Sequence, residues 1–186
     1  MKRTAWLAGI GAAVLAAGGL ALAKRPAQRP DGGSGPLPVG AAAPDVSGQD
    51  QQGRAQSLRG ELGHPVLVYF YPRDGTPGCT AEACAFRDAW ERYAKAGVTL
   101  FGVSSDDARS HAHFAEEHRI PFPLIADGEL RWADAFGVSR MLGITSRISF
   151  LIDPAGKVAK VYRDVDPGVH ADEVLRDVAA LPQPGS

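Results

Sequence analysis

Cys79 and Cys84 are the two cysteines of this 186-residue chain, and their setting points to thiol chemistry. Cys79 follows a loop that leaves an apolar run, and helical periodicity begins at this residue. In the first turn of a helix, free backbone amides and the helix dipole stabilise an anion. The thiolate is the nucleophilic form of cysteine. Cys79 is therefore the candidate nucleophile, and a buried, unreactive cysteine is the alternative.

Cys84 lies five residues further along the same predicted helix. Five helical residues rise about 7.5 Å and turn about 500°, which separates the two Cα atoms by about 8.7 Å. A disulfide requires Cα atoms within about 7 Å of each other. The two thiols can therefore join only if the first helical turns unwind. This spacing favours a switch between a reactive thiol and a disulfide, with a passive apolar role for Cys84 as the alternative.

Three further residues are candidates for the same site. Arg147 begins the apolar run Ile148–Ile152, where a charged head is costly unless it meets an anion. A guanidinium beside Cys79 would stabilise both the thiolate and a negative oxygen. In the loop before Cys79, Pro72 stiffens the backbone and Thr76 can hydrogen-bond to the sulfur or to a bound oxygen. A surface arginine at a strand end is the alternative for Arg147.

The elements on either side must position these residues. Continuous apolar runs predict strands covered on both faces at Pro65–Tyr71 and Val98–Val103. Between them, apolar residues at helical spacing predict one helix over 79–96. Its inner stripe is formed by Cys79, Ala83, Phe86, Trp90 and Tyr93. Because sites form at the carboxyl ends of strands in open α/β sheets, Cys79 lies at a favoured position.

The rest of the pattern continues the same architecture. The expected elements are a hairpin within 45–58, a helix from the caps Ser104, Ser105 and Asp106 to His118, a strand at 122–126, a helix at 129–136, hairpin strands at 146–152 and 157–163, and a last helix from Asp166-Pro167 with Val174, Leu175 and Val178 on its inner face. This order predicts an α/β fold with a mixed central sheet and helices on both faces.

The first 38 residues have a different character. Lys2 and Arg3 give the start of the chain a positive charge. The apolar run Ala5–Ala23 follows and ends in the small-x-small pattern Ala21-Leu22-Ala23. Residues 1–23 are therefore interpreted as a signal peptide or an N-terminal membrane anchor, and the chain is expected to be exported, to the periplasm or another extracytoplasmic space. Residues 24–38 are expected to be a flexible Pro/Gly linker, and residues 39–181 the folded domain.

Composition excludes several function classes. The 20 basic and 21 acidic residues are interspersed and give a net charge of −1, so nucleic acid is not an expected partner. Two cysteines with no close histidine provide too few ligands for a zinc site, and we expect no metal or other cofactor. His111 and His113 form the one histidine pair at metal-like spacing, and we interpret both as solvated surface residues.

A known family matches these residues. Pro72, Thr76 and Cys79 fit Pro-x-x-x-Thr-x-x-Cys, and the chain resembles the peroxiredoxins. The longer run Phe-Tyr-Pro-x-Asp-x-Thr-Pro-Gly-Cys-Thr, with a cysteine five positions on, is similar to the bacterioferritin comigratory protein, or PrxQ, subfamily. The resemblance covers residues 38–180 and includes Ala43-Pro44-Asp45, Gly102-Val103-Ser104, Phe114, Pro121-Phe122, Asp127, Gly137-Val138 and Arg147-x-x-Phe-Leu-Ile-Asp.

The resemblance implies a thioredoxin-like fold and a peroxidase that reduces hydrogen peroxide and organic hydroperoxides. Cys79 would be the peroxidatic cysteine, in a pocket formed by Pro72, Thr76 and Arg147, and Cys84 the intrachain resolving cysteine. A thioredoxin-like dithiol protein would recycle the enzyme, and export requires such a donor outside the cytoplasm. We expect a monomer, with a weak dimer as the alternative.

Two other classes of function remain as alternatives. One is an extracytoplasmic thiol-disulfide oxidoreductase acting on proteins. Such enzymes typically carry Cys-x-x-Cys at the helix start, whereas position 82 here is Glu. The other is a non-enzymatic thioredoxin-like module tethered to a membrane. Loss of Thr76 or Arg147 would indicate such a module, and the chain retains both.

Overall fold

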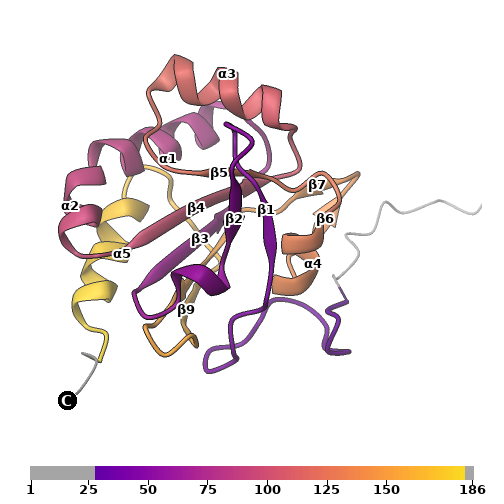
Figure 1. Ribbon diagram of the computed structural model, residues 1–186, viewed down its shortest axis with the longest axis vertical. Coiled ribbons are helices and arrows are strands. Elements are labelled where there is room, and N and C mark those ends of the chain that lie inside the picture. Colours follow the sequence, from indigo (N-terminus) through magenta and orange to yellow (C-terminus); the bar gives the residue numbers. More distant parts are fainter. Residues whose placement is uncertain (1–27, 183–186) are drawn as a thin grey trace, which may run out of the picture.

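A computed structural model describes residues 28–182 of the chain (Figure 1), so the predicted signal peptide or anchor lies outside the described residues. The elements in chain order are β1 (Ser47–Gln49), β2 (Ala55–Ser57), the 3-10 turn η1 (Arg59–Glu61), β3 (Val66–Phe70), α1 (Pro77–Asp88), α2 (Trp90–Lys95), β4 (Thr99–Ser104), α3 (Ala108–His118), β5 (Leu124–Ala126), α4 (Arg131–Phe136), β6 (Arg140–Met141), β7 (Ile144–Thr145), β8 (Ile148–Ile152), β9 (Val158–Tyr162) and α5 (His170–Ala179).

The central sheet has five strands in the order β5-β4-β3-β8-β9. Strands β3, β4 and β5 run parallel, whereas β8 is antiparallel to β3 and β9 is antiparallel to β8. The central strands β3 and β8 are buried along their whole length, as continuous apolar runs require. The predicted mixed sheet is confirmed, and so are the hairpins β1–β2 and β8–β9.

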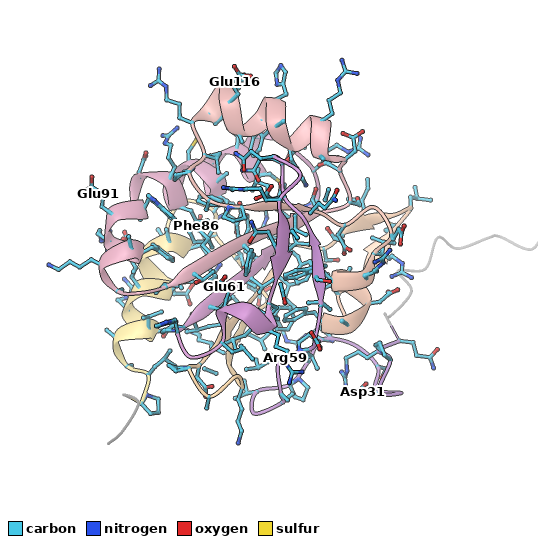
Figure 2. The ribbon with its side chains drawn as sticks, viewed as in Figure 1. Asp31, Arg59, Glu61, Phe86, Glu91 and Glu116 are labelled. Atoms are coloured by element: carbon cyan, nitrogen blue, oxygen red, sulfur yellow. The ribbon has the colours of Figure 1, made fainter. Side chains whose placement is uncertain are left out.

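Two apolar clusters cover the two faces of the sheet. Alternate residues of β3 supply them, with Leu67 and Tyr69 in one cluster and Val68 and Phe70 in the other. Residues of α1, α2, α3 and α5 contribute to the first cluster, and residues of α4 contribute to the second, so helices cover both faces (Figure 1). Figure 2 shows Phe86 of α1 inside the molecule, and its side chain is fully buried.

The single helix predicted over 79–96 is wrong in one respect, because the chain forms two helices that meet at Ala89 (φ −90°, ψ 0°). The spacing of the apolar stripe continues through this bend and therefore could not reveal it. Beyond the bend, the Trp90 ring lies 5.8 Å from that of Phe122, and the Tyr93 hydroxyl donates to the Ala171 carbonyl at 2.9 Å. The bend thus lets α2 pack both on the segment before β5 and on α5.

The predicted caps of α3 are also corrected. Asp107 is the N-cap, and its carboxylate accepts a hydrogen bond from the Ser110 amide at 2.8 Å. Ser104 and Asp106 bond to each other instead, since the Ser104 hydroxyl donates to the Asp106 carboxylate at 3.0 Å. The short ribbon of β6 and β7 was not predicted, because two-residue strands are too short to show a period.

The described part of the expected linker runs along α4. Leu37 is buried, and its amide donates to the Phe136 carbonyl at 3.0 Å. Gly137 ends α4 with φ +67°, and a Cβ at this position would lie 1.9 Å from the Gly35 carbonyl oxygen. A glycine is therefore required where the two segments meet. Within residues 28–182, no helix has the length and apolar character needed to cross a membrane.

Helix α5 begins at a fully buried histidine. The Nε2 atom of His170 lies 2.9 Å from the Ser149 hydroxyl, and its ring packs at 4.9 Å from that of Tyr162. Burial lowers the pKa of His170 to about 4. Glu173 opposes this shift, whereas the positive charges of Arg147 and Lys160 add to it. The folded protein therefore holds this imidazole neutral.

This pKa predicts a specific loss of stability in acid. The unfolded chain protonates His170 near pH 6.5, whereas the folded protein resists until about pH 4. The contribution of the neutral imidazole is therefore complete above pH 6.5 and is lost as the pH falls towards 4. Between pH 7.5 and 4.5, the protein should lose roughly 2 kcal/mol more unfolding free energy than a His170→Asn variant in urea titrations. Equal losses would contradict the assignment, and exposed His64→Asn is the control.

Candidate active site

Cys79 is the third residue of α1, directly after the loop that leaves β3. Thr76 is the N-cap in extended conformation (φ −75°, ψ 145°), and Pro77 occupies the first helical position, where the missing amide hydrogen costs nothing. Cys79 is buried, with 2% of its surface exposed. The sulfur thus lies at the positive end of the helix dipole and largely out of water, as the sequence predicts.

The structure brings Arg147 to Cys79. Residue Phe70 at the end of β3 pairs with Ile148 at the start of β8, so the residue before β8 lies level with the loop that leads to α1. The Nη2 atom of Arg147 donates to Cys79 Sγ at 3.2 Å. A Cβ at position 78 would lie 3.2 Å from this same nitrogen, so Gly78 leaves room for the guanidinium. The predicted pair of cation and thiol is therefore present.

Glu82 is a member of the site that sequence reasoning missed. Its side chain is fully buried, and its Oε2 atom accepts from Arg147 Nη1. Burial raises the pKa of Glu82 to about 7, although Arg147 opposes the rise. Within the described residues, the Oε1 atom has no hydrogen-bond partner. The sequence contains a signal for this burial. Glu82 lies three residues after Cys79 and four before Phe86, which places a carboxyl group on the apolar stripe of the helix.

Arg147 therefore bridges a buried carboxyl and a buried sulfur. Burial by itself disfavours its cation, but Glu82 and Cys79 outweigh burial and raise the pKa of Arg147 above its ordinary value. The guanidinium stays charged and half-buried between them. A fixed cation of this kind can stabilise a thiolate and the negative charge that develops on an oxygen atom attacked by it.

Pro72 and Thr76 lie in the loop between β3 and α1. Pro72 is half-buried, and the Thr76 hydroxyl donates to the Arg73 carbonyl at 3.2 Å rather than to the sulfur. The loop is held at its start by Thr145, whose hydroxyl donates to the Tyr71 carbonyl at 2.8 Å. The contacts of Pro72 and Thr76 with a bound peroxide stay a prediction.

Cys84 lies in α1 with Cys79, as predicted, and both thiols are free. Its side chain is half-buried, in contrast to the buried Cys79. With the helix intact, the ideal separation of the two Cα atoms is about 8.7 Å, too long for a disulfide. The reduced form and the folded helix are therefore compatible, whereas a Cys79–Cys84 disulfide and the folded helix are not.

One prediction about the histidines is wrong. His113 is exposed as expected, but His111 is fully buried. Its Nδ1 atom lies 2.8 Å from a carboxylate oxygen of Asp74, which comes from the loop before Cys79. The polar face of α3 suggested solvent at this position, but it meets a polar partner 37 residues earlier in the chain.

The same region contains the group of side chains most similar to a metal site. Asp74, Asp106 and His111 each place one possible ligand atom within 4.8 Å of the others. These atoms are already engaged with protein groups, because Asp106 accepts from the Asp74 amide at 2.7 Å and Asp74 accepts from the Ser110 hydroxyl at 2.8 Å. Their geometry is that of a hydrogen-bond network that needs no ion.

Comparisons with known proteins identify the family of this chain. Residues 39–161 match the AhpC/TSA family. The chloroplastic peroxiredoxin Q of Oryza sativa subsp. japonica is 41% identical over 150 residues, which are 79% of this chain and 69% of the rice protein. The crystal structure of peroxidoxin BcpB from Mycobacterium tuberculosis superposes with a TM-score of 0.74 at 36% identity, over 79% of this chain and 99% of that protein.

A second solved structure gives the same result. Peroxiredoxin Q from Xanthomonas campestris superposes with a TM-score of 0.71 at 35% identity, over 77% of this chain and 96% of that protein. These likenesses confirm the thioredoxin-like fold and the resemblance to PrxQ. The alternative, a thiol-disulfide oxidoreductase acting on proteins, is not better supported by these matches than a peroxidase is. The chain belongs to the AhpC/TSA family and is a peroxiredoxin of the Q type, a thiol peroxidase that reduces peroxides with electrons from a thioredoxin-like protein.

Proposed function

We propose that Cys79 is the peroxidatic cysteine and Cys84 the resolving cysteine of this peroxidase. The observation that carries the assignment is the 3.2 Å contact between Arg147 Nη2 and Cys79 Sγ at the start of α1. A cation and a helix N-terminus both favour the thiolate. Cys84 is five residues away in the same helix and has a free thiol.

In the first step, the Cys79 thiolate attacks one oxygen of the peroxide. A sulfur–oxygen bond forms, the oxygen–oxygen bond breaks, and the leaving alkoxide or hydroxide takes a proton to become an alcohol or water. Cys79 is oxidised to a sulfenic acid. Arg147 stabilises the charge that moves onto the oxygens, and Thr76 and Pro72 shape the pocket around the peroxide. This step requires the folded α1, because only the folded helix holds Cys79 against Arg147.

In the second step, the first turns of α1 unwind and the Cys84 thiol attacks the sulfenic sulfur. A disulfide forms between Cys79 and Cys84, and water leaves. A thioredoxin-like dithiol protein then reduces this disulfide by exchange, so that its own thiols become oxidised and both cysteines are restored. The half-buried position of Cys84 favours this step, since a modest opening of the helix exposes it.

Glu82 acts as a positioning residue for Arg147. It binds Nη1 of the guanidinium, so Nη2 remains directed at the sulfur. Because the pKa of Glu82 is raised to about 7, the carboxyl is largely ionised at pH 8 and largely neutral at pH 6. The ionised carboxylate holds the arginine more firmly than the neutral acid does.

The cellular setting is proposed from the N-terminal sequence. The apolar segment 5–23 supports export to the periplasm or another extracytoplasmic space, either by a cleaved signal or with a retained membrane tether. The similar peroxiredoxin Q proteins of rice and wheat are named as chloroplastic, so these relatives also act outside the cytosol. The thioredoxin-like reductant would then act in the same compartment. We expect a monomer, with a weak dimer as the alternative.

Substitution of either cysteine separates the two steps. Cys79→Ser should abolish peroxide consumption, because serine cannot supply a thiolate. Cys84→Ser should still consume one equivalent of peroxide and stop at a sulfenic acid on Cys79. Rapid quenching and mass spectrometry measure both outcomes. Turnover that persists in Cys79→Ser, or a Cys84→Ser protein that cycles normally with a thioredoxin-like donor, would contradict the assignment.

Substitution of Arg147 tests the contact between its guanidinium and the Cys79 sulfur. Arg147→Lys keeps a positive charge but loses the forked geometry that serves Glu82 and Cys79 together. The second-order rate constant for oxidation of Cys79 by hydrogen peroxide should fall by about a factor of 100. Stopped-flow tryptophan fluorescence can follow this step. A decrease of less than threefold would refute the role of Arg147, and the exposed Arg59→Lys is the matched control.

The pH profile of a Glu82→Gln variant tests the positioning role. At pH 6 the carboxyl is largely neutral and resembles an amide, so the two proteins should oxidise at similar rates. At pH 8 the unaltered protein carries the carboxylate and should react about tenfold faster than the variant. A rate ratio that does not change with pH would show that Glu82 ionisation has no part in positioning Arg147. Exposed Glu91→Gln serves as the control.

A further inference from the structure

The buried contact between His111 and Asp74 is not used by either chemical step. Asp74 lies in the loop between β3 and α1, five residues before Cys79, and its carboxylate oxygen Oδ2 is 2.8 Å from His111 Nδ1. The other ring nitrogen, Nε2, lies 3.2 Å from the Ile125 carbonyl oxygen. Both ring nitrogens therefore lie within hydrogen-bond distance of protein oxygen atoms, which hold the ring from both sides.

Asp74 is the centre of the network. Its Oδ1 atom accepts from the Tyr71 hydroxyl at 2.8 Å, and its Oδ2 atom accepts from the Ser110 hydroxyl at 2.8 Å as well as from His111. Burial opposes ionisation, but the bond from His111 and the other donors outweigh it and hold the pKa of Asp74 below its ordinary value. The side chain is 7% exposed. The network is thus a buried carboxylate held by three hydrogen-bonded side chains, and removal of one of them would leave a buried acceptor with fewer partners.

These hydrogen bonds fix one end of the segment that must rearrange. The Asp74 amide is also held, by Asp106 Oδ2 at 2.7 Å. The next residue, Gly75, has φ +68° and open space around it. The chain therefore passes from an anchored residue to a glycine, whose backbone has access to more conformations than that of other residues, just before α1 begins. Gly75 is thus the first position after the anchored Asp74 at which the chain can change direction when the first turns of α1 unwind.

We propose that His111 is a positioning residue that, with Asp74, clamps the reactive-cysteine loop (residues 72–78) and thereby slows formation of the Cys79–Cys84 disulfide. With the clamp closed, the unwound segment is short and gains little conformational entropy. With the clamp open, the whole loop is released together with the helical turns, and the open form becomes more populated. The clamp contacts neither Cys79 nor Arg147, and folded α1 still holds these two together when the clamp is open, so its release should change disulfide formation far more than the attack on peroxide. This role rests on the proposed function of the two cysteines.

Single-turnover kinetics with hydrogen peroxide test the clamp in the full chain. Rapid quenching and mass spectrometry separate thiol, sulfenic acid and disulfide at each time. In His111→Leu and in Asp74→Asn, disulfide formation should be about tenfold faster than in the unaltered protein, while oxidation of Cys79 changes by less than threefold. His111→Asn can keep a donor towards Asp74 and should fall between His111→Leu and the unaltered protein.

Two controls distinguish the clamp from general loss of stability. His113→Leu changes an exposed histidine of the same helix, and Val158→Ala removes buried volume in β9, in the opposite apolar cluster. Neither should accelerate disulfide formation, even where Val158→Ala melts at a lower temperature. If His111→Leu does not fold, Asp74→Asn and His111→Asn carry the test.

The outcomes separate this inference from the proposed function. Unchanged or slower disulfide formation in the folded variants would refute the clamp, provided that the unaltered protein forms the disulfide. An equal acceleration in Val158→Ala would also refute it, because the effect would then be one of global stability. If the unaltered protein forms no Cys79–Cys84 disulfide at all, the assignment of Cys84 fails first.

Discussion

Both cysteines lie in the single helix α1, which fixes the distance between them. The rest of the site depends on this constraint. While the helix is intact, the Cα atoms of Cys79 and Cys84 stand about 8.7 Å apart, beyond the reach of a disulfide. The folded helix also supplies the N-terminal turn that favours a thiolate and aligns Cys79 with Arg147. The first chemical step therefore needs the helix and the second needs its opening. The stability of about two helical turns becomes a functional quantity.

Two buried polar contacts lie on either side of these turns. Arg147, which is bound by Glu82 of α1, donates to the sulfur, and His111 holds Asp74 in the loop that leads into the helix. Both contacts cost desolvation, and neither is an efficient way to stabilise a fold. Their location suits a segment that must adopt one defined geometry and then release it. The two apolar clusters on either side of the sheet supply the stability that this arrangement does not.

The sequence predicted the parts of the site that depend on local pattern. Cys79 at a helix start follows from an apolar run, a proline-rich loop and helical spacing, and Arg147 follows from a charge at the edge of a buried strand. Glu82 was missed because its partner, Arg147, lies 65 residues away, although its place on the apolar stripe was a usable signal. His111 was misread for the same reason, because only the fold brings Asp74 to it. The periodicity of apolar residues along a sequence does not reveal which polar residues far apart in the chain become partners in the fold.

The central claim is that α1 is folded when Cys79 is a thiol and unwound when Cys79 is bonded to Cys84. Hydrogen–deuterium exchange of the amides in residues 80–84 measures this most directly, in the fully reduced protein and in the protein oxidised with one equivalent of peroxide. The account predicts slow exchange in the reduced form and rapid exchange in the disulfide form, with β3 protected in both. Equal protection of residues 80–84 in the two forms, with the Cys79–Cys84 disulfide verified by mass spectrometry, would contradict it.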